Sequence, residues 1–393
     1  MTLTDLLTLC CERQASDIHL SAGLPPYLRV QGVLEPQAEL GVTSNEWLAS
    51  VVELLPLGAS RQSLERIGSA DGALSAKDGT RFRVNVFRRR DALSIALRRL
   101  EDRFRSLSEL GLPDTLYDLC DLAHGLVIVG GPTGSGKSTS LATLIDRINQ
   151  TRRGHIITIE DPIEYLHESR QSLVNQRQVG TDAATFDDAL VASLRQDPDV
   201  ILVGEIREIK TIRTAITAAE TGHLVFTTVH AGDCVGVIER LVSVFPADEQ
   251  PGVRRQLSLV LQAVVVQHLL VADGRLVGQA ASLPSATKAV AADEDEINGR
   301  LEACPTATTR RQRVVASEVM RMTPAVANLI ANGKANQIYS SMESGSAAGM
   351  QTFEQDLARL WVGGWISEQT ATAYARNPGV LQDRANRLRM KRP

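Results

Sequence analysis

The stretch from Leu126 to Ile148, LVIVGGPTGSGKSTSLATLIDRI, decides the fold of this 393-residue chain. An apolar run, a glycine-rich loop and an amphipathic segment of helical periodicity follow one another, which predicts a strand, a phosphate-binding loop and a helix. The loop matches the full G-x-x-x-x-G-K-[ST] pattern from Gly131 to Ser138. Glycines let backbone N–H groups approach phosphate oxygens, and the amino end of the helix adds a favourable dipole. The stretch therefore predicts a nucleoside triphosphate site.

Two side chains of this loop have predicted roles in binding the nucleotide and Mg²⁺. Lys137 reaches the β- and γ-phosphates, and the Ser138 hydroxyl is a ligand of Mg²⁺. A glycine turn that matches the pattern by chance is disfavoured, because the strand, the helix, the lysine and the serine occur together. The predicted nucleotide-binding residues of the loop are Gly131, Pro132, Thr133, Gly134, Ser135, Gly136, Lys137, Ser138 and Thr139.

The chain around this loop alternates apolar strands with helical stretches. Further buried strands are expected at Ile156–Ile159, Val200–Val203 and Leu224–Thr228. This alternation is typical of an α/β protein whose parallel sheet is covered by helices on both faces. In such a sheet the carboxyl ends of the strands face the ligand crevice.

Acidic residues follow two of these strands and are candidates for hydrolytic chemistry. Glu164 ends the run EDPIE, which follows one strand, and Glu205 follows the strand VILVG. Hydrolysis needs one carboxylate to position water and another near the metal, and the sheet brings both strand ends toward the loop. Such acids can instead cap helices or face solvent. A Gly-Glu pair after an apolar strand, as at Glu205, is typical of the Walker B position, which binds Mg²⁺.

Two histidines bracket the strand LVFTTV. His230 lies at its carboxyl end, where it can sense the γ-phosphate, whereas His223 lies at its start and is the weaker candidate. A lone histidine is more often structural than catalytic, and that alternative stays open for both. Neither has a cysteine at metal-binding spacing, so a zinc site is not expected.

The remaining chain predicts further domains. Mixed helical and alternating patterns indicate a small α+β domain over residues 1–100, and a Gly/Pro-containing stretch at 101–113 indicates a linker. Residues 114–320 form the predicted ATPase core, in which the polar, Ala- and Thr-rich segment 284–312 is expected to be a mobile insertion. Residues 321–393 are expected to form a C-terminal helical subdomain.

Composition excludes several classes of protein. Lys and Arg total 42 against 46 Asp and Glu, and aromatic residues are only 4%, which disfavours a nucleic-acid partner. The longest apolar run, Leu257–Val266, is too short to span a bilayer, so any membrane association is expected to use a partner protein. No secretory signal is evident, and a cytoplasmic location with reduced thiols is expected. The scattered cysteines are Cys10, Cys11, Cys120, Cys234 and Cys304.

Four sequence blocks together carry a family resemblance. GPTGSGKST, IEDPIEY, LRQDPDVILVGEIR and AAETGHLVFTTVHA resemble the type IV pilus motor ATPases, specifically the retraction-type PilT/PilU group, within the secretion ATPases that also power type II secretion. The resemblance runs from residues 15–19 (ASDIH) to beyond 349–355 (GMQTFEQ). It implies a RecA-like core, an N-terminal PAS-like domain and a homohexamer. It also implies ATP hydrolysis that drives pilus retraction at an inner-membrane platform protein, with the motor docked peripherally at the bacterial inner membrane.

The resemblance also implies roles for individual residues. Lys137 and Ser138 are the Walker A pair and Glu205 is the Walker B acid. Glu164, in the Asp box, is the general base. The His box opens at His223 and closes at His230.

Arginines of the N-terminal domain are implied to reach the nucleotide at a subunit interface. They are Arg81, Arg83 and Arg98. A mobile domain that contacts ATP in this way would convert hydrolysis into domain motion. Without the resemblance, the run RFRVNVFRRR indicates a solvated basic strand, and this alternative stays open for Arg83.

Two features bear on the direction of the motor. The extra N-terminal domain and paired-cysteine metal site of assembly-type motors are not expected, which favours the retraction type. The family's AIRNLIRE motif, however, is AVANLIAN at residues 325–332. Two alternatives are still pilus-type motors: one that assists a second pilus ATPase, and one that serves a specialised type IVb pilus, a type II secretion system or a conjugative transfer system. Two others belong to different classes: a RecA-like nucleic-acid translocase, and a regulator that binds ATP without turnover.

Overall fold

The computed structural model describes residues 2–30, 33–58, 60–100, 103–274 and 313–390. The predicted insertion at 284–312 lies outside these residues. The described chain divides into two compact units, each with its own hydrophobic core. The N-terminal unit is Met1–Arg103 with Glu164–Leu166 and Gly180–Asp182, and the larger unit is Phe104–Ile163, His167–Val179 and Ala183–Pro393.

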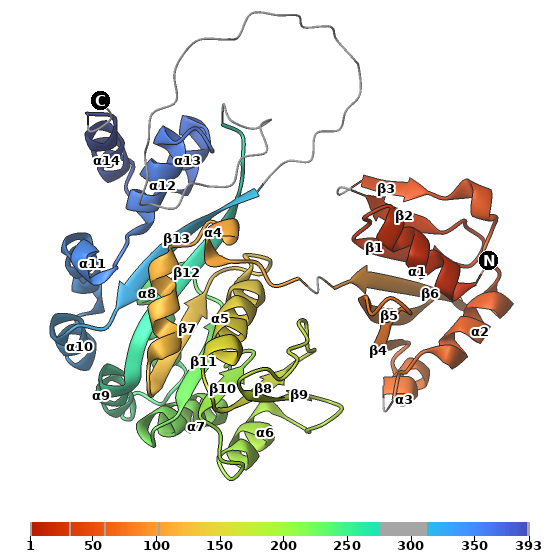
Figure 1. Cartoon of the computed structure of the whole chain (residues 1–393), viewed down its shortest axis with the longest axis horizontal. Coiled ribbons are helices and arrows are strands. Elements are labelled where there is room, and N and C mark those ends of the chain that lie inside the picture. Colours follow the sequence, from red (N-terminus) through yellow and green to blue (C-terminus); the bar gives the residue numbers. More distant parts are fainter. Residues whose placement is uncertain (1, 31–32, 59, 101–102, 275–312, 391–393) are drawn as a thin grey trace, which may run out of the picture. The chain divides into compact units, whose positions relative to one another are not determined.

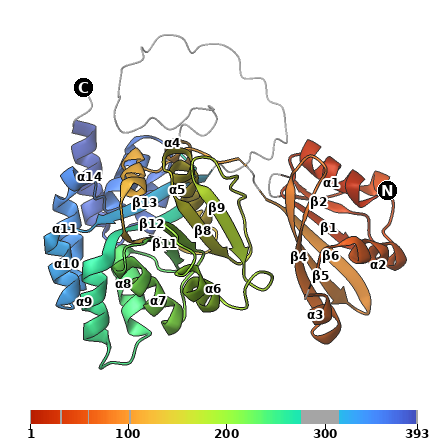
Figure 2. The same cartoon turned by 60° about the horizontal axis from the view of Figure 1, so that its bottom comes forward.

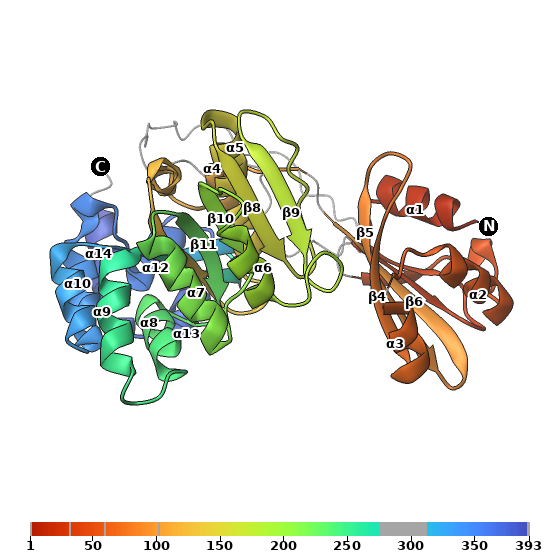
Figure 3. The same cartoon turned by 90° about the horizontal axis from the view of Figure 1, so that it is seen from below.

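The N-terminal unit is built on a six-stranded antiparallel sheet with strand order β3-β2-β1-β6-β5-β4. Helices α1 and α2 lie on one face of this sheet (Figure 3), where Phe82, Val84 and Val86 of β5 are fully buried. Side chains alternate between the two faces of a strand, so Arg81 and Arg83 belong to the opposite face. The elements are α1 (Leu3–Glu12), β1 (Asp17–Ser21), β2 (Tyr27–Val30), β3 (Val33–Pro36), η1 (Ala38–Leu40), α2 (Asn45–Leu54), α3 (Ser60–Arg66), β4 (Ser69–Ser75), β5 (Arg81–Arg89) and β6 (Ala92–Arg99).

The larger unit contains a seven-stranded sheet with strand order β13-β12-β7-β11-β10-β8-β9 (Figure 1). Six of these strands are parallel, but β13 runs antiparallel to β12, so the sheet is mixed where a parallel sheet was predicted. The expectation of an α/β protein is confirmed. The strands are β7 (Gly125–Gly130), β8 (His155–Glu160), β9 (Leu173–Gln178), β10 (Val200–Val203), β11 (Leu224–Val229), β12 (Leu261–Val271) and β13 (Arg313–Arg321).

Helices cover both faces of this sheet, which explains why β7, β10 and β11 are buried along their whole length. One face packs against α4, η2 and α5, and the other packs against α6 to α11 (Figure 2). The helices are α4 (Leu107–Leu110), η2 (Asp114–Asp121), α5 (Lys137–Thr151), α6 (Phe186–Ser193), α7 (Ile209–Glu220), α8 (Cys234–Ser243), α9 (Gln250–Val260), α10 (Pro324–Ala331), η3 (Ala335–Gln337), α11 (Ile338–Ser344), η4 (Ser346–Ala348), α12 (Phe353–Val362), α13 (Glu368–Tyr374) and α14 (Pro378–Met390).

Two features of the larger unit position the site described below. Helix α9 ends at Val260 and strand β12 begins at Leu261, so no residue separates the helix from the strand. Helices α12 to α14 form a smaller core with β12 and β13, centred on Leu357 and Leu360. Through this core the end of the chain is attached to the sheet.

A membrane span would need a helix that is both long and apolar. Within the described residues, no helix meets both requirements.

Candidate nucleotide site

The predicted site residues of the larger unit follow adjacent strands of its sheet. The glycine-rich loop follows β7, Glu205 is the second residue after β10, and His230 comes directly after β11. Because β7, β11 and β10 are neighbours and run parallel, their carboxyl ends share one edge of the sheet. The structure thus brings these predicted residues together.

The glycine-rich loop closes around its own lysine. The Lys137 side chain is buried, and its Nζ donates hydrogen bonds to the carbonyl oxygens of Gly131 and Pro132, at 3.0 and 2.9 Å. Gly131 has φ of +143°, and a Cβ there would lie 2.4 Å from the carbonyl oxygen of Gln267. No other residue fits at this position without moving the backbone. The predicted residues at or near the loop surface are Pro132, Thr133, Gly134, Gly136, Ser138 and Thr139.

A glutamine of β12 supports this loop from the neighbouring strand. Gln267 is 1% exposed, and its Nε2 donates a hydrogen bond of 2.7 Å to the carbonyl oxygen of Ser135. Its Oε1 accepts a hydrogen bond of 2.9 Å from Ser140 Oγ in α5. Gln267 therefore ties the loop and the following helix to the sheet. Sequence reasoning missed this residue, because a single glutamine in an apolar run carries no recognisable pattern.

A small polar cluster forms beside the loop around Glu205. Its carboxylate oxygen Oε2 lies 2.7 Å from Arg207 Nη2 and 3.7 Å from His230 Nε2. Burial lowers the pKa of His230, and the nearby positive charge of Lys137 lowers it further. His230 is therefore neutral at pH 7, and Arg207 is the charged partner of Glu205. Sequence reasoning did not assign a role to Arg207, although it lies two residues after Glu205.

The chemistry of this cluster fits a nucleotide with Mg²⁺. The Ser138 hydroxyl and the Glu205 carboxylate are hard oxygen ligands of the kind Mg²⁺ prefers, with phosphates and water completing its shell. Ser135 Oγ is buried and has no hydrogen-bond partner among the described residues. A polar atom of this kind, inside a loop of inward-facing backbone, suits a phosphate oxygen. Within the same residues, no group of three or more His, Cys, Asp or Glu side chains could hold a metal by itself.

Comparison with known proteins assigns the chain to a family. Residues 2–360 match the type II/IV secretion system protein family. The chain belongs to this family. It is 39% identical over 378 residues to the type IV pilus retraction ATPase PilT of Pseudomonas aeruginosa, a match that covers 96% of this chain and 99% of that protein. It is 36% identical over 390 residues to the type IV pilus ATPase PilU of the same organism, covering 99% and 91%.

A solved structure of a relative agrees with these matches. The crystal structure of the pilus retraction motor PilT with bound ADP has a TM-score of 0.83 and 38% identity, and the match covers 98% of this chain and 99% of that one. The resemblance to the PilT/PilU group is confirmed, and so is the prediction that this secretion-family chain is an ATPase.

Glu164, the predicted general base, is assigned to the N-terminal compact unit, whereas Glu205 and His230 belong to the larger unit. It is half-buried and belongs to the segment Glu164–Leu166, which is part of the N-terminal compact unit. Its role in activating water stays a prediction. Glu160, at the end of β8, is fixed within the larger unit, because its Oε1 accepts hydrogen bonds from Thr158 Oγ1 (2.7 Å) and Gln176 Nε2 (3.2 Å).

His223 lies at the amino end of β11, opposite the glycine-rich loop. Its Nδ1 lies 3.0 Å from the carbonyl oxygen of Ala218 and 3.2 Å from Thr221 Oγ1, at the end of α7. It precedes His230 by seven positions along the chain, roughly 20 Å in an extended strand. These contacts support the structural interpretation of His223.

The three predicted arginines all lie on β5 and β6 of the N-terminal unit. Arg83 pairs with Arg98 across the two antiparallel strands, and both side chains are exposed. Arg98 Nε donates a hydrogen bond of 2.8 Å to the buried carboxylate of Asp17, whereas Arg81 lies opposite Ser75 of β4. The predicted reach of these arginines to a nucleotide stays a prediction.

Proposed function

We propose that this chain is the ATP-driven motor of type IV pilus retraction. The observation that carries the proposal is the placement of Lys137, Glu205 and His230 at one sheet edge, in a chain that spans 99% of the length of a pilus retraction ATPase. A nucleotide-binding regulator without turnover is disfavoured by the Glu205 cluster, which is built for chemistry at a phosphate. A nucleic-acid translocase is disfavoured by the balanced charge and the scarcity of aromatic residues.

Each residue of the site has a role in this proposal. Lys137 leaves the loop carbonyls to stabilise charge on the β- and γ-phosphates. Ser138 and Glu205 would hold Mg²⁺, which neutralises phosphate charge when bound. His230 senses the γ-phosphate as a neutral hydrogen-bonding group, and Glu164 orients and deprotonates the attacking water.

The proposed working form is a homohexamer. It combines a RecA-like core over residues 114–320, a PAS-like domain over 1–100, a linker over 101–113 and a helical subdomain over 321–393. Arg81, Arg83 and Arg98 of one subunit contact the nucleotide of a neighbour, so that hydrolysis changes the relation of two domains. The hexamer works in the cytoplasm, docked on an inner-membrane pilus platform protein.

The general base is tested with the Glu164→Gln variant, which removes the carboxylate but keeps the size and polarity of the side chain. We expect ATP binding to stay within about twofold of wild type and turnover to fall by about 100-fold or more. Fluorescent-nucleotide titration and a phosphate-release assay measure the two. Glu168→Gln, which changes a nearby exposed acid, is the matched control. Wild-type turnover in Glu164→Gln would refute the assignment of the base.

The direction of the motor is tested in cells. A deletion strain that keeps surface pili but no longer disassembles them establishes retraction. Bald cells would indicate assembly instead and would refute the proposal. Re-expression of Lys137→Ala separates loss of ATP binding from loss of the protein, because a retraction motor needs the nucleotide and not only the chain.

A second candidate is an accessory motor that acts together with another pilus ATPase. Helix α10 carries Ala327 and Ala331 where the family motif has two arginines, and Asn332, which follows the helix, stands where the motif has a glutamate. The Asn332 side-chain amide donates hydrogen bonds to Asn328. This surface therefore lacks the charges of the motif. Restoring them with Ala327→Arg, Ala331→Arg and Asn332→Glu should let the chain retract pili without the second motor if the accessory interpretation is right.

A further inference from the structure

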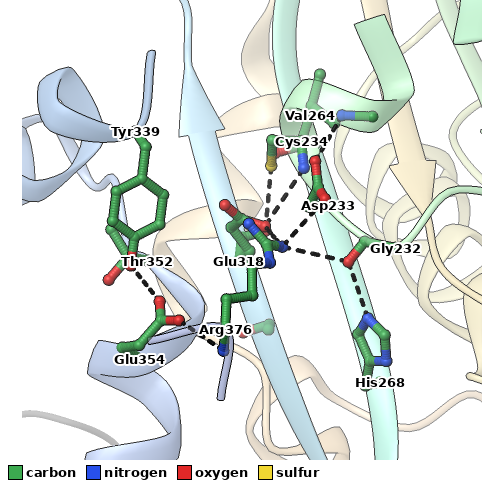
Figure 4. Close-up of polar contacts among 12 residues, drawn as sticks. Gly232, Asp233, Cys234, Val264, His268, Glu318, Tyr339, Thr352, Glu354 and Arg376 are labelled. Carbon is green, nitrogen blue, oxygen red and sulfur yellow. Dashed lines mark hydrogen bonds and ion pairs between the residues drawn. The ribbon is translucent and has the colours of Figure 1, made fainter. Parts of the chain in front are cut away.

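An ion pair between a buried glutamate and a partly exposed arginine connects the last strand of the larger sheet with the C-terminal helices (Figure 4). Glu318 of β13 is 0% exposed, and its Oε2 lies 2.8 Å from Nη2 of Arg376. The same oxygen accepts a hydrogen bond of 3.3 Å from the backbone N–H of Cys234, the first residue of α8. Arg376 lies between α13 and α14, far along the chain from both partners.

The same guanidinium also reaches the loop that follows β11. Arg376 Nη2 lies 3.3 Å from the carbonyl oxygen of Gly232 and 3.6 Å from Asp233 Oδ2. The Gly232 carbonyl is contacted a second time, by His268 Nε2 of β12 at 3.0 Å. One arginine therefore joins β13, α8 and this loop, and Figure 4 shows these groups around it.

This loop is short, and His230 is its first residue. Only residues 230–233 connect the end of β11 to the start of α8. Asp233 caps α8 by accepting a hydrogen bond of 2.5 Å from the N–H of Gly236. Gly232 is exposed and has no side chain to pack, and no atom lies within 4 Å of where its Cβ would be. The two hydrogen bonds to its carbonyl oxygen, from Arg376 and His268, therefore contribute to its position.

The backbone of Arg376 is itself held firmly. The N–H groups of Arg376 and Asn377 donate to Oε1 of Glu354, at 3.1 and 3.3 Å. Glu354 lies in α12 and is 0% exposed, and its other oxygen accepts a hydrogen bond from Tyr339. The guanidinium thus extends toward the loop from an anchored point, which limits the positions it can take.

We propose that Arg376 is a positioning residue for His230. By binding the Gly232 carbonyl and Asp233 while paired with Glu318, it holds the loop so that His230 stays beside Glu205. This inference rests on the role of His230 in the proposed function. It also gives the segment between α13 and α14, in which Arg376 lies, a part in turnover. In the contacts above, this segment touches neither Glu205 nor the glycine-rich loop.

The test variant is Arg376→Lys, with Arg384→Lys as the matched control. A lysine keeps the charge that Glu318 needs, but its single nitrogen lacks the planar fork that reaches several acceptors at once. Arg384 of α14 is also a C-terminal arginine, paired with Glu343 at 3.1 Å and without a contact to the His230 loop among the described hydrogen bonds. We expect kcat to fall about tenfold in Arg376→Lys, with KM for ATP within about twofold of wild type.

The same substitution in a His230→Gln background shows whether the effect passes through His230. If Arg376 acts by positioning that residue, Arg376→Lys causes no further fall in kcat once His230 is gone. Gel filtration and thermal unfolding check that assembly and stability are unchanged. If the lysine variant does not fold, the double change Arg376→Gln with Glu318→Gln leaves no buried charge unpaired, and the same fall in kcat is expected.

Three outcomes would overturn the inference. Turnover in Arg376→Lys equal to that in Arg384→Lys would show that the arginine does not position the loop. A tenfold fall that persists in the His230→Gln background would show that it acts elsewhere. If His230→Gln alone leaves kcat unchanged, the role of His230 in the proposed function fails, and the inference about Arg376 fails with it. The first two outcomes, by contrast, refute only the inference about Arg376.

Discussion

Replacing Gln267 with methionine should weaken nucleotide binding without disturbing the sheet. Methionine has nearly the same length and volume as glutamine, so the buried space in β12 stays filled. What is lost is the 2.7 Å hydrogen bond from Gln267 Nε2 to the carbonyl oxygen of Ser135. Ser140 Oγ loses its bond to Oε1 but keeps one to the carbonyl oxygen of Gly136, at 3.2 Å.

The size of this effect follows from the buried acceptor left at Ser135. An unsatisfied buried polar group costs about 1–3 kcal/mol, and we take about 2 kcal/mol for a single carbonyl in the loop. If the unsatisfied carbonyl destabilises only the loop conformation that binds nucleotide, the full cost of about 2 kcal/mol is lost from the binding free energy, and ATP binding weakens by about 30-fold. Catalytic groups are untouched, so kcat at saturating ATP should change far less than the affinity does.

The assay is a titration with a fluorescent ATP analogue, accompanied by thermal unfolding. Gln262→Met is the matched control, because Gln262 lies on the same strand but beside Gly125, at the opposite end of β7 from the glycine-rich loop. We expect the control to bind ATP like wild type. Binding within twofold of wild type in Gln267→Met would refute the idea that this glutamine supports the loop.

Two further substitutions test the loop geometry and the pH dependence of stability. Gly131→Ala should abolish nucleotide binding, because its Cβ would lie 2.4 Å from a backbone oxygen, whereas Gly180→Ala, with φ of +84° and open space, should bind normally in the same titration. Burial lowers the pKa of His167 to about 4, below the unfolded value of about 6.5, so its protonation favours the unfolded chain and stability falls as pH drops from about 6.5 toward 4. His167→Phe should therefore lose about 2 kcal/mol less stability than wild type between pH 7 and pH 5 in urea unfolding. An equal loss in both proteins would contradict the assignment to His167.

Local sequence patterns predicted those parts of the site that lie directly after an apolar strand. The loop from Gly131 to Ser138 and the strands before Glu205 and His230 were all found, because each combines an apolar run with a nearby chemical group. Such patterns are set by short-range geometry, so one sequence suffices to see them.

Contacts between distant segments could not be predicted in this way. Gln267 and Arg376 act on residues more than 100 positions away, and nothing in their own neighbourhood marks them. The strand β9 was missed because its residues are largely half-exposed and polar, so no apolar alternation identifies it. The apolar run from Leu257 to Val266 hid a helix that passes directly into a strand, since both elements there bury apolar residues.

The absence of any residue between α9 and β12 limits which insertions the chain tolerates. Loops commonly accept extra residues, but one residue added between Val260 and Leu261 would either turn α9 by about 100° or shift β12 by one position. In the second case Val266 would take the place of Gln267 in the sheet, and the Gln267 side chain would point to the opposite face and lose its hydrogen bond to the carbonyl oxygen of Ser135. Support of the glycine-rich loop at Ser135 therefore requires a fixed number of residues between the end of α9 and position 267, just as it requires a glutamine at that position.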